Sequence, residues 1–460
     1  MSIEPTEGRT VRVPPLWLVL LLTALVFAIG ALWKIGCGPP YEQLCYNDVF
    51  PLYSGRGLFN GVRVYLDAYD GRYLEYPVLT GVVLQVAGWI TGSGGDLMEK
   101  SHTFVAVTAL LLLPFALATT AAMWHTEPGT RIHPPSWASF DRRTPKRSSI
   151  DRRSRWRGAA AVGAVGAVGA AVSAVRERVG PRAALMVAVA PVLLLDGTIN
   201  WDLVAVAFTA LAMWAWSRDA PLWTGIFLGL GASAKLYPLF ILGPLLVLCV
   251  RDRRWQAALR AVAGTAGAWL IANLPVMLLN FQGWKEFYTF SQTRGIDFGS
   301  IWLAWSNFGH PFIDSSTANT ASAALFLVGC LAVAVLAWLC PAARLAQLAF
   351  LVIAVFVLVN KVYSPQYALW LLPLAALARP RWPAFLLWQL GEVVYFVAIW
   401  RFLSGYGQVI VPDGAISTSA YTWAIVIHVA LTVMFGALIV VDVVRESRQF
   451  QTIASARVVV

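Results

Sequence analysis

The chain has 460 residues, of which 58 % are hydrophobic and only 13 % are charged, and its mean hydropathy is +0.65. Soluble proteins carry about twice that charged fraction, so a soluble fold, a disordered chain and a disulfide scaffold are excluded. The net charge of +11 does not indicate nucleic-acid binding, because the basic residues form short clusters between apolar spans. The composition therefore predicts an all-α polytopic membrane protein.

The first apolar run, residues 15–33, follows a short N-terminal segment, 1–14, that carries Arg9 and Arg12. No small-residue cleavage site follows the run, and it is long enough to span a bilayer. We therefore expect a retained first transmembrane helix with a cytoplasmic N-terminus. The next segment, 34–101, is polar and rich in Gly and Tyr, which predicts a large first extracytoplasmic loop. Residues 102–124 predict the second transmembrane helix.

Two apolar segments, 79–91 and 159–175, leave the number of spans open. If both crossed the bilayer, the connection between them would lie outside, although it holds nine Lys and Arg against three acids. Basic residues in short loops favour the cytoplasm. We therefore expect a basic cytoplasmic insert over 125–181, an interfacial helix at 79–91 and about 12 transmembrane helices, with 14 as the alternative.

Residues 182–441 carry the other predicted spans. These are 182–199, 202–217, 220–234, 237–250, 257–279, 320–340, 344–360, 365–377, 383–401 and 419–441. Several are shorter than the roughly 20 residues that a perpendicular helix needs, so we expect broken or tilted helices. Basic clusters in alternate connections predict a second extracytoplasmic loop at 280–317 and a cytoplasmic tail at 442–460.

Asp48 is the strongest candidate for a catalytic base. It follows the first predicted helix closely, in a loop dense with Tyr, Asn and Arg, where partial burial would raise the basicity of a carboxylate. The other interpretation is a solvated loop acid or a cap for the following helix. The acids held in reserve for the same role are Asp67, Glu75, Asp196 and Asp202.

Two lysines are expected on the outer side, each between two predicted spans. Lys235 lies in the turn Leu-Gly-Ala-Ser-Ala-Lys-Leu-Tyr-Pro, and Lys361 lies in Asn-Lys-Val-Tyr-Ser-Pro-Gln-Tyr. A lone cation at the depth of lipid headgroups suits a phosphate, although a lysine there can also simply extend to water. Two such lysines on one face predict a phosphate-binding site.

The outer segments also carry groups that suit sugar hydroxyls and rings that can stack on a sugar. They are Tyr46, Arg56, Glu75, Tyr76, Asn200, Asp202, Tyr237, Tyr363, Gln366 and Tyr367, with His310 from the loop 280–317. Asn200 could instead cap a helix. The aromatic-rich loop 280–317 is long for a connector, which predicts a lid over a site. Glu392, in the middle of a span, either serves the function or hydrogen-bonds a neighbouring helix.

Cys37 and Cys45 are eight residues apart in the first outer loop. On an oxidising face this spacing permits a disulfide that closes a small loop directly before Asp48. No spacing of Cys and His resembles a zinc site. The sequence indicates no cofactor, and a divalent metal ion is not indicated either.

The order and shared sidedness of these motifs resemble the GT-C glycosyltransferases. More narrowly, they resemble the polyprenol-phosphate-mannose-dependent mannosyltransferase-like proteins of actinobacteria, glycosyltransferase family 87. The resemblance rests on the first helix with its Asp-bearing loop, on Tyr76-Pro77 before the interfacial helix, and on the two lysine turns. It extends from about Trp17 to Val441, apart from the segment 125–178.

The resemblance implies a GT-C-like bundle in the plasma membrane that transfers mannose, with inversion, from a polyprenyl-phosphate-sugar donor on the extracytoplasmic face. The expected acceptor is lipid-linked or a glycolipid, and the only other expected partners are membrane lipids. Asp48 matches the first-loop acid that deprotonates the acceptor, while Lys235 and Lys361 match positions near the donor phosphate. Only one acid stands where some GT-C enzymes carry a pair, which indicates a single base. A polytopic transporter or flippase of lipids or glycans is the alternative.

Overall fold

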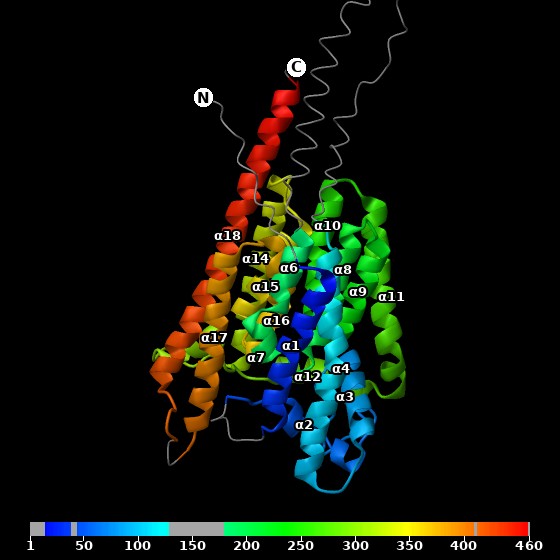
Figure 1. The fold of residues 1–460 in the computed structure, drawn as a ribbon, viewed down its shortest axis with the longest axis vertical. Helices are drawn as coiled ribbons and strands as arrows, with labels where there is room; N and C mark the ends of the chain where they lie inside the picture. The colour runs from blue at the N-terminus through cyan, green and yellow to red at the C-terminus, as the bar shows by residue number, and fades with distance from the viewer. Residues whose placement is uncertain (1–13, 38–43, 128–178, 409–411, 459–460) are drawn as a thin grey trace, which may run out of the picture.

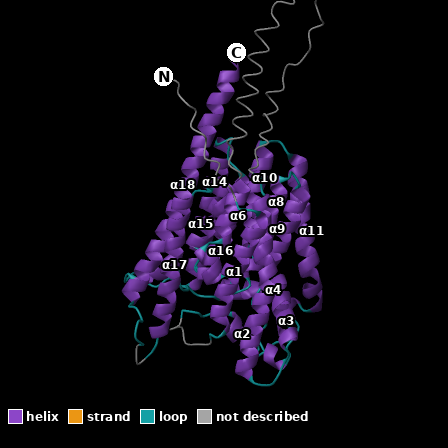
Figure 2. Cartoon of the chain, in the orientation of Figure 1, coloured by secondary structure: helices purple, strands orange, loops and turns teal. Residues whose placement is uncertain are grey.

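The computed structural model describes residues 14–37, 44–127, 179–408 and 412–458, and every regular element in these ranges is a helix (Figures 1 and 2). The first half holds α1 (Leu16–Ile35), α2 (Val49–Gly55), η2 (Leu58–Asn60), α3 (Val78–Thr91), α4 (Leu97–His125), α6 (Val179–Ala188), α7 (Pro191–Asp196), α8 (Asp202–Ser217), α9 (Pro221–Ala234), η4 (Tyr237–Ile241) and α10 (Leu242–Arg251). The second half holds α11 (Trp255–Leu279), α12 (Phe281–Thr293), α13 (Ile301–Asn307), α14 (Ser315–Leu339), α15 (Leu345–Val359), η5 (Pro365–Tyr367), α16 (Ala368–Ala378), α17 (Trp382–Gly405) and α18 (Thr418–Val458).

Six of the described helices are long and apolar enough to cross a membrane, namely α1, α4, α11, α14, α17 and α18. Shorter apolar helices stand beside them, as the short predicted spans indicated. The prediction of an all-α polytopic membrane protein is confirmed. The number of spans stays a prediction, because most of the basic insert, residues 128–178, lies outside the described residues.

The predicted spans at 182–199 and 102–124 have different bounds in the structure. The span at 182–199 is two helices, α6 and α7, because Pro191 has no N–H to continue a helix and instead begins a new one. The second span begins at Leu97, where the Asp96 carboxylate accepts the Glu99 N–H at 2.8 Å and caps α4.

The predicted loop 280–317 and the predicted tail 442–460 are also largely helical. The loop contains α12, whose first turn is capped by Asn280, then α13 and the start of α14, which is capped by Asp314. The helix α18 continues past residue 441 to Val458. No Gly or Pro occurs between residues 442 and 458 to stop it.

The core of the bundle is centred on α16, all of whose residues are buried. Around it, α4 packs against α1 and α8, α9 packs against α8 and α11, and α17 packs against α18. The α9–α11 contact is very close because glycines form it. A Cβ at Gly225 would lie 2.0 Å from the Ala261 carbonyl oxygen, and one at Gly264 would lie 2.4 Å from that of Leu222.

We expect Gly225→Ala to destabilise the protein by about 1–3 kcal/mol, because α9 and α11 must move apart to admit the new methyl group. Gly267→Ala on α11 is the matched control, since its Cβ would meet nothing within 4 Å. The control should keep or slightly raise the melting temperature, because Ala is the better helix former. Thermal unfolding in detergent measures both, and equal melting temperatures would contradict the close α9–α11 packing.

The two ends of the bundle differ in chemistry. At one end, arginines bind carbonyl groups at the ends of neighbouring helices: Arg251 donates to Ala337 and Cys340, and Arg344 donates to Leu377 and Ala378. At the same end Arg379 pairs with Asp442. The short helices α2 and α3 lie at the opposite end (Figure 1). That second end carries the polar segments that were predicted to lie outside.

Candidate active site

A cavity of about 890 Å³ opens at the end that carries α2 and α3. It collects residues from α2, α12, η4, η5 and α17, and from the loops between them. The residues chosen from the sequence that line it are Tyr46, Asp48, Arg56, Glu75, Tyr76, Asn200, Lys235, Tyr237, Lys361, Gln366 and Tyr367. Segments more than 300 residues apart in the chain (residues 46 and 367) therefore meet around one space.

Asp48 precedes the short helix α2, yet its carboxylate does not cap that helix. Asn47 does so, because its Oδ1 accepts the Phe50 N–H at 2.8 Å. The interpretation of Asp48 as a helix cap is therefore wrong. Its carboxylate is left to face the cavity.

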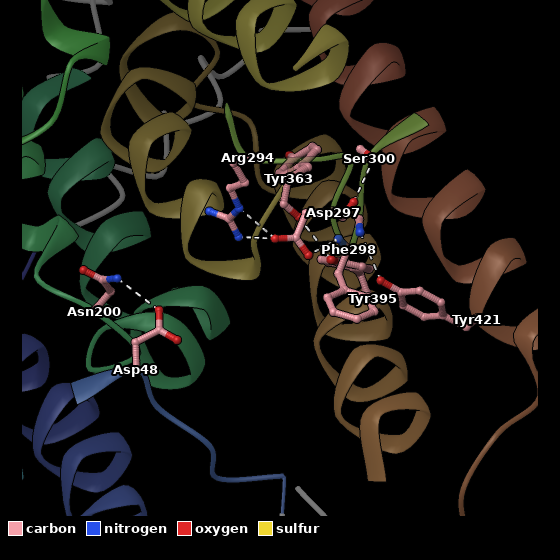
Figure 3. Close-up of polar contacts among 10 residues, drawn as sticks. Asp48, Asn200, Arg294, Asp297, Phe298, Ser300, Tyr363, Tyr395 and Tyr421 are labelled. Atoms are coloured by element: carbon pink, nitrogen blue, oxygen red, sulfur yellow. Dashed lines mark hydrogen bonds and ion pairs between the residues drawn. The ribbon is translucent and has the colours of Figure 1, made fainter. Parts of the chain in front are cut away.

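The turn before α8 holds Asp48 in place. The Asp48 N–H donates to the Ile199 carbonyl at 2.8 Å, and Asn200 Nδ2 donates to Asp48 Oδ2 at 3.0 Å (Figure 3). Asn200 Nδ2 also lies 2.8 Å from the Tyr76 hydroxyl. Burial raises the pKa of Asp48, and the Asn200 hydrogen bond and the Lys235 charge offset this only in part. The carboxylate is thus a stronger base than an ordinary aspartate.

The end of α1 is tied to the same loop. Cys37, directly after α1, and Cys45 are joined in a disulfide with a Cα–Cα distance of 5.8 Å. Asn47 Nδ2 donates to the Lys34 carbonyl at 3.5 Å. Cys45 and Asn47, directly before Asp48, are therefore tied to the end of α1.

Lys235 ends α9 and has a buried counterion. Its Nζ lies 3.5 Å from Asp202 Oδ1 and 4.9 Å from the centre of the Tyr76 ring. Asp202 is fully buried, accepts the Trp370 Nε1–H at 2.7 Å and does not line the cavity. The structure therefore separates two predicted roles. Asp202 is the counterion of Lys235. It does not line the cavity, so the predictions that it binds substrate or serves as a reserve base are wrong.

Lys361 lies across the cavity with Arg294 near it. Lys361 Nζ donates to the Gln292 carbonyl at 3.1 Å. Burial lowers the pKa of Lys361, and the Arg294 charge lowers it further. Arg294 itself lines the cavity and pairs with Asp297, with Nε 2.8 Å from Oδ2. Besides Arg56, which pairs with Glu75, three cations line the cavity that Asp48 faces: Lys235, Lys361 and Arg294. Such a group suits the oxygens of a phosphate.

Part of the chain matches a known family. A family model, glycosyltransferase family 87, matches residues 153–360. Over this stretch the chain is similar to that family. The match includes Asn200, Lys235 and Arg294, ends one residue before Lys361 and does not reach Asp48. A comparison with curated proteins found no match. The match and the membrane-spanning helices indicate a membrane glycosyltransferase.

Sequence reasoning did not select Arg294. Its place depends on a short backbone pairing, in which the Asp297 N–H donates to the Lys361 carbonyl at 2.9 Å and the Tyr363 N–H donates to the Phe298 carbonyl at 3.3 Å. The Asp297 carboxylate, which holds Arg294, also accepts the Phe298 N–H at 2.7 Å (Figure 3). The residues after α12 are thereby fixed to the Lys361 turn.

Tyrosines of α17 and α18 form hydrogen bonds to the two paired segments. Tyr395 donates to the Tyr363 carbonyl at 3.1 Å, and Tyr421 accepts the Gly299 N–H at 3.0 Å (Figure 3). Gly299 has φ +79°, and a Cβ there would lie 2.1 Å from both the Tyr363 carbonyl and the Tyr395 hydroxyl. Only glycine fits this position.

Two residues predicted to bind substrate do not line the cavity. His310 is exposed and stacks on Trp305 with ring centres 3.9 Å apart. Tyr363 is buried and donates to Glu392 at 3.3 Å. Both predictions are corrected here: His310 follows the helix α13 and points to the surface, and the backbone pairing of Tyr363 turns its ring into the core.

The remaining acids are either paired with arginines or absent from the cavity lining. Glu75 pairs with Arg56, with Arg56 Nε 2.6 Å from Glu75 Oε2, and both line the cavity. Asp67 forms an exposed ion pair with Arg63. Asp196 is buried at the end of α7 and does not line the cavity. Of the acids considered for the base, Asp48 is the one that faces the cavity without a close cationic partner.

Glu392 links helices within the core. Its Oε1 accepts hydrogen bonds from Trp388 and Thr432 at 3.1 Å each, in addition to the Tyr363 bond. His428 Nδ1 lies 3.5 Å from its other oxygen. The structure favours the interpretation that Glu392 bonds a neighbouring helix, since α18 supplies two of these groups. In the described ranges, no group of three His, Cys, Asp or Glu side chains could hold a metal ion.

Proposed function

We propose that this protein transfers a sugar from a polyprenyl-phosphate donor to a hydroxyl of a lipid or glycan acceptor, with inversion and with Asp48 as general base. The observation that supports the proposal is that Asp48 lines the same cavity as Lys235, Lys361 and Arg294. A base and a phosphate-binding group are the two requirements of such a transfer. On the resemblance to polyprenol-phosphate-mannose-dependent enzymes, we propose mannose as the sugar.

The proposed reaction makes one bond and breaks one bond. The acceptor hydroxyl oxygen attacks the anomeric carbon, and its proton passes to the Asp48 carboxylate. The bond between the anomeric carbon and the phosphate oxygen breaks on the opposite side, and its electron pair leaves with the polyprenyl phosphate. The three cations stabilise the negative charge that grows on the phosphate oxygens in the transition state.

The chemistry of the two ends supports an extracytoplasmic site in the plasma membrane. The arginines of the connections lie at the end opposite to the cavity, and basic connections favour the cytoplasm. Nucleotide sugars are absent outside the cytoplasm, so a donor on the outer face must be lipid-linked. Phe287, Phe290 and Phe356 line the cavity beside the cations and offer an apolar path for a polyprenyl chain.

Transfer in proteoliposomes tests the proposal. We expect the purified protein to transfer sugar from a polyprenyl-phosphate-sugar donor and to ignore the corresponding nucleotide sugar. Protein reconstituted with the donor but without acceptor is the control for hydrolysis. Transfer from the nucleotide sugar in the absence of any lipid-linked donor would overturn the proposed donor class. Movement of the donor between leaflets without any transfer would instead indicate a flippase.

A further inference from the structure

A second cavity lies at the arginine-rich end of the bundle, where α8 connects to α9 and α10 connects to α11. Its volume is about 580 Å³. The residues that line it come from two turns, one at Asp219 and one at Arg253 and Arg254, and from the first residues of α9 and α11. Because the glycines of α9 and α11 hold these helices in close contact, the two helices form a rigid wall of the cavity.

The second cavity is strongly basic. Arg253, Arg254 and Arg260 line it together with one acid, Asp219, so its lining has a net charge of +2. Arg254 pairs with Asp219 and lies 5.1 Å from the centre of the Trp216 ring. Arg253 and Arg260 are exposed, and the side chain of neither forms an ion pair or hydrogen bond with the part of the chain that the structure describes. Two guanidinium groups are therefore free to bind an anion.

The backbone at Arg253 is unfavourable for an arginine. Its φ is +54°, in the turn where the Arg254 N–H donates to the Cys249 carbonyl at 2.7 Å. Helix ends of this kind favour glycine, because a Cβ is strained at positive φ. Gly at this position would thus make the folded protein more stable than Arg does. What Arg253 adds is a positive charge.

The surface beside the cavity is apolar and exposed. Trp255 and Leu259 of α11 are 61 % and 70 % exposed, and farther along the helix Leu278 is 77 % exposed. The helix α11 is one of the helices that can span a membrane, and little of it is buried. The cavity therefore lies where the lipid-facing surface of α11 begins, beside an exposed Trp of the kind that is common at headgroup depth.

We propose that this second cavity binds the phosphate-bearing headgroup of an anionic phospholipid, whose acyl chains lie along α11. Guanidinium groups bind phosphate oxygens in pairs, which suits Arg253 and Arg260. A free phosphate has the same charge but no apolar part. The exposed Trp255 and Leu259 favour the lipid, because they provide a surface for the chains directly beside the charged groups.

Lipid binding to the full-length protein in detergent tests the proposal, measured by native mass spectrometry with phosphatidylglycerol and phosphatidylcholine. We expect preferential binding of phosphatidylglycerol. The double variant Arg253→Gly/Arg260→Gln should weaken it about 25-fold, since each basic residue near a membrane surface contributes about fivefold. The glycine relieves the positive φ, so this variant should fold at least as well as the original, which a melting curve verifies.

The control is Arg448→Gln, which removes an exposed charge of α18 at the same end of the bundle but outside the cavity. It should leave phosphatidylglycerol binding within about twofold of the original. An equal loss in the control would overturn the proposal in favour of a general effect of positive charge. Inorganic phosphate that displaces the lipid at millimolar concentration would also overturn it, since the cavity would then be a site for a free anion.

Discussion

Replacing Asp48 by Asn is expected to slow sugar transfer roughly 10²–10⁴-fold, because the change keeps the shape of the side chain and removes the proton acceptor. The protein should fold normally. Burial raises the pKa of Asp48 in the folded state, so the ionised carboxylate costs free energy of folding at neutral pH, and the neutral amide removes that cost. The rate of transfer in proteoliposomes and a melting curve measure the two effects separately.

Asp67→Asn is the matched control for this experiment. Asp67 lies in the same loop, is half-buried, pairs with Arg63 and does not line the cavity. Exposed ion pairs contribute about 0–1 kcal/mol, so the control should transfer sugar at nearly the original rate. Near-normal turnover by the Asp48→Asn variant would remove Asp48 as the base. A comparable loss in both variants would point to a general effect of charge in the loop.

The pH dependence of the reaction gives an independent check. A general base must be ionised, so the rate should fall as the pH drops through the pKa of Asp48. Because burial raises this pKa, the acid limb should lie above the range of an ordinary aspartate, whose pKa is about 3.9. The limb should disappear in the residual activity of Asp48→Asn. A limb that persists in this variant would belong to another group.

The sequence predicted the fold class and much of the cavity because the relevant signals are local. A charged residue beside the end of an apolar run must lie near the membrane surface, and this places Asp48, Lys235 and Lys361 at that depth. Alternating basic connections then put them on one side. These two rules are enough to predict that such residues lie at one end of a helix bundle, without any knowledge of how the helices pack.

Features that depend on contacts between distant segments could not be predicted in this way. Arg294 faces the cavity only because residues 297–298 pair with residues 361–363, and no local pattern around Arg294 indicates that pairing. His310 was selected because it lies in the same aromatic loop, yet the helix α13 directs it to the surface. Asp202 and Asp48 look alike in sequence, and only the packing of Trp370 shows that Asp202 is a buried partner of Lys235.

The second large effect is expected for Lys235, whose replacement by Met should lower transfer roughly 10²–10³-fold, the cost of losing one group that stabilises charge in a transition state. The single variant also affects folding. It leaves the buried Asp202 carboxylate without its cation, and breaking a buried pair costs about 3–5 kcal/mol. A loss of activity in Lys235→Met alone would therefore not separate phosphate binding from folding.

The double variant Lys235→Met/Asp202→Asn separates the two roles. It removes both charges together, and the new amide oxygen still accepts the hydrogen bond that Trp370 donates to Asp202, so most of the lost stability should return. Transfer should stay low, because no cation replaces Lys235 at the cavity. The melting temperature and the transfer rate of the single and double variants are the measurements. If the rate recovers together with the melting temperature, Lys235 is only the counterion of Asp202, and the phosphate must be held by Arg294 and Lys361.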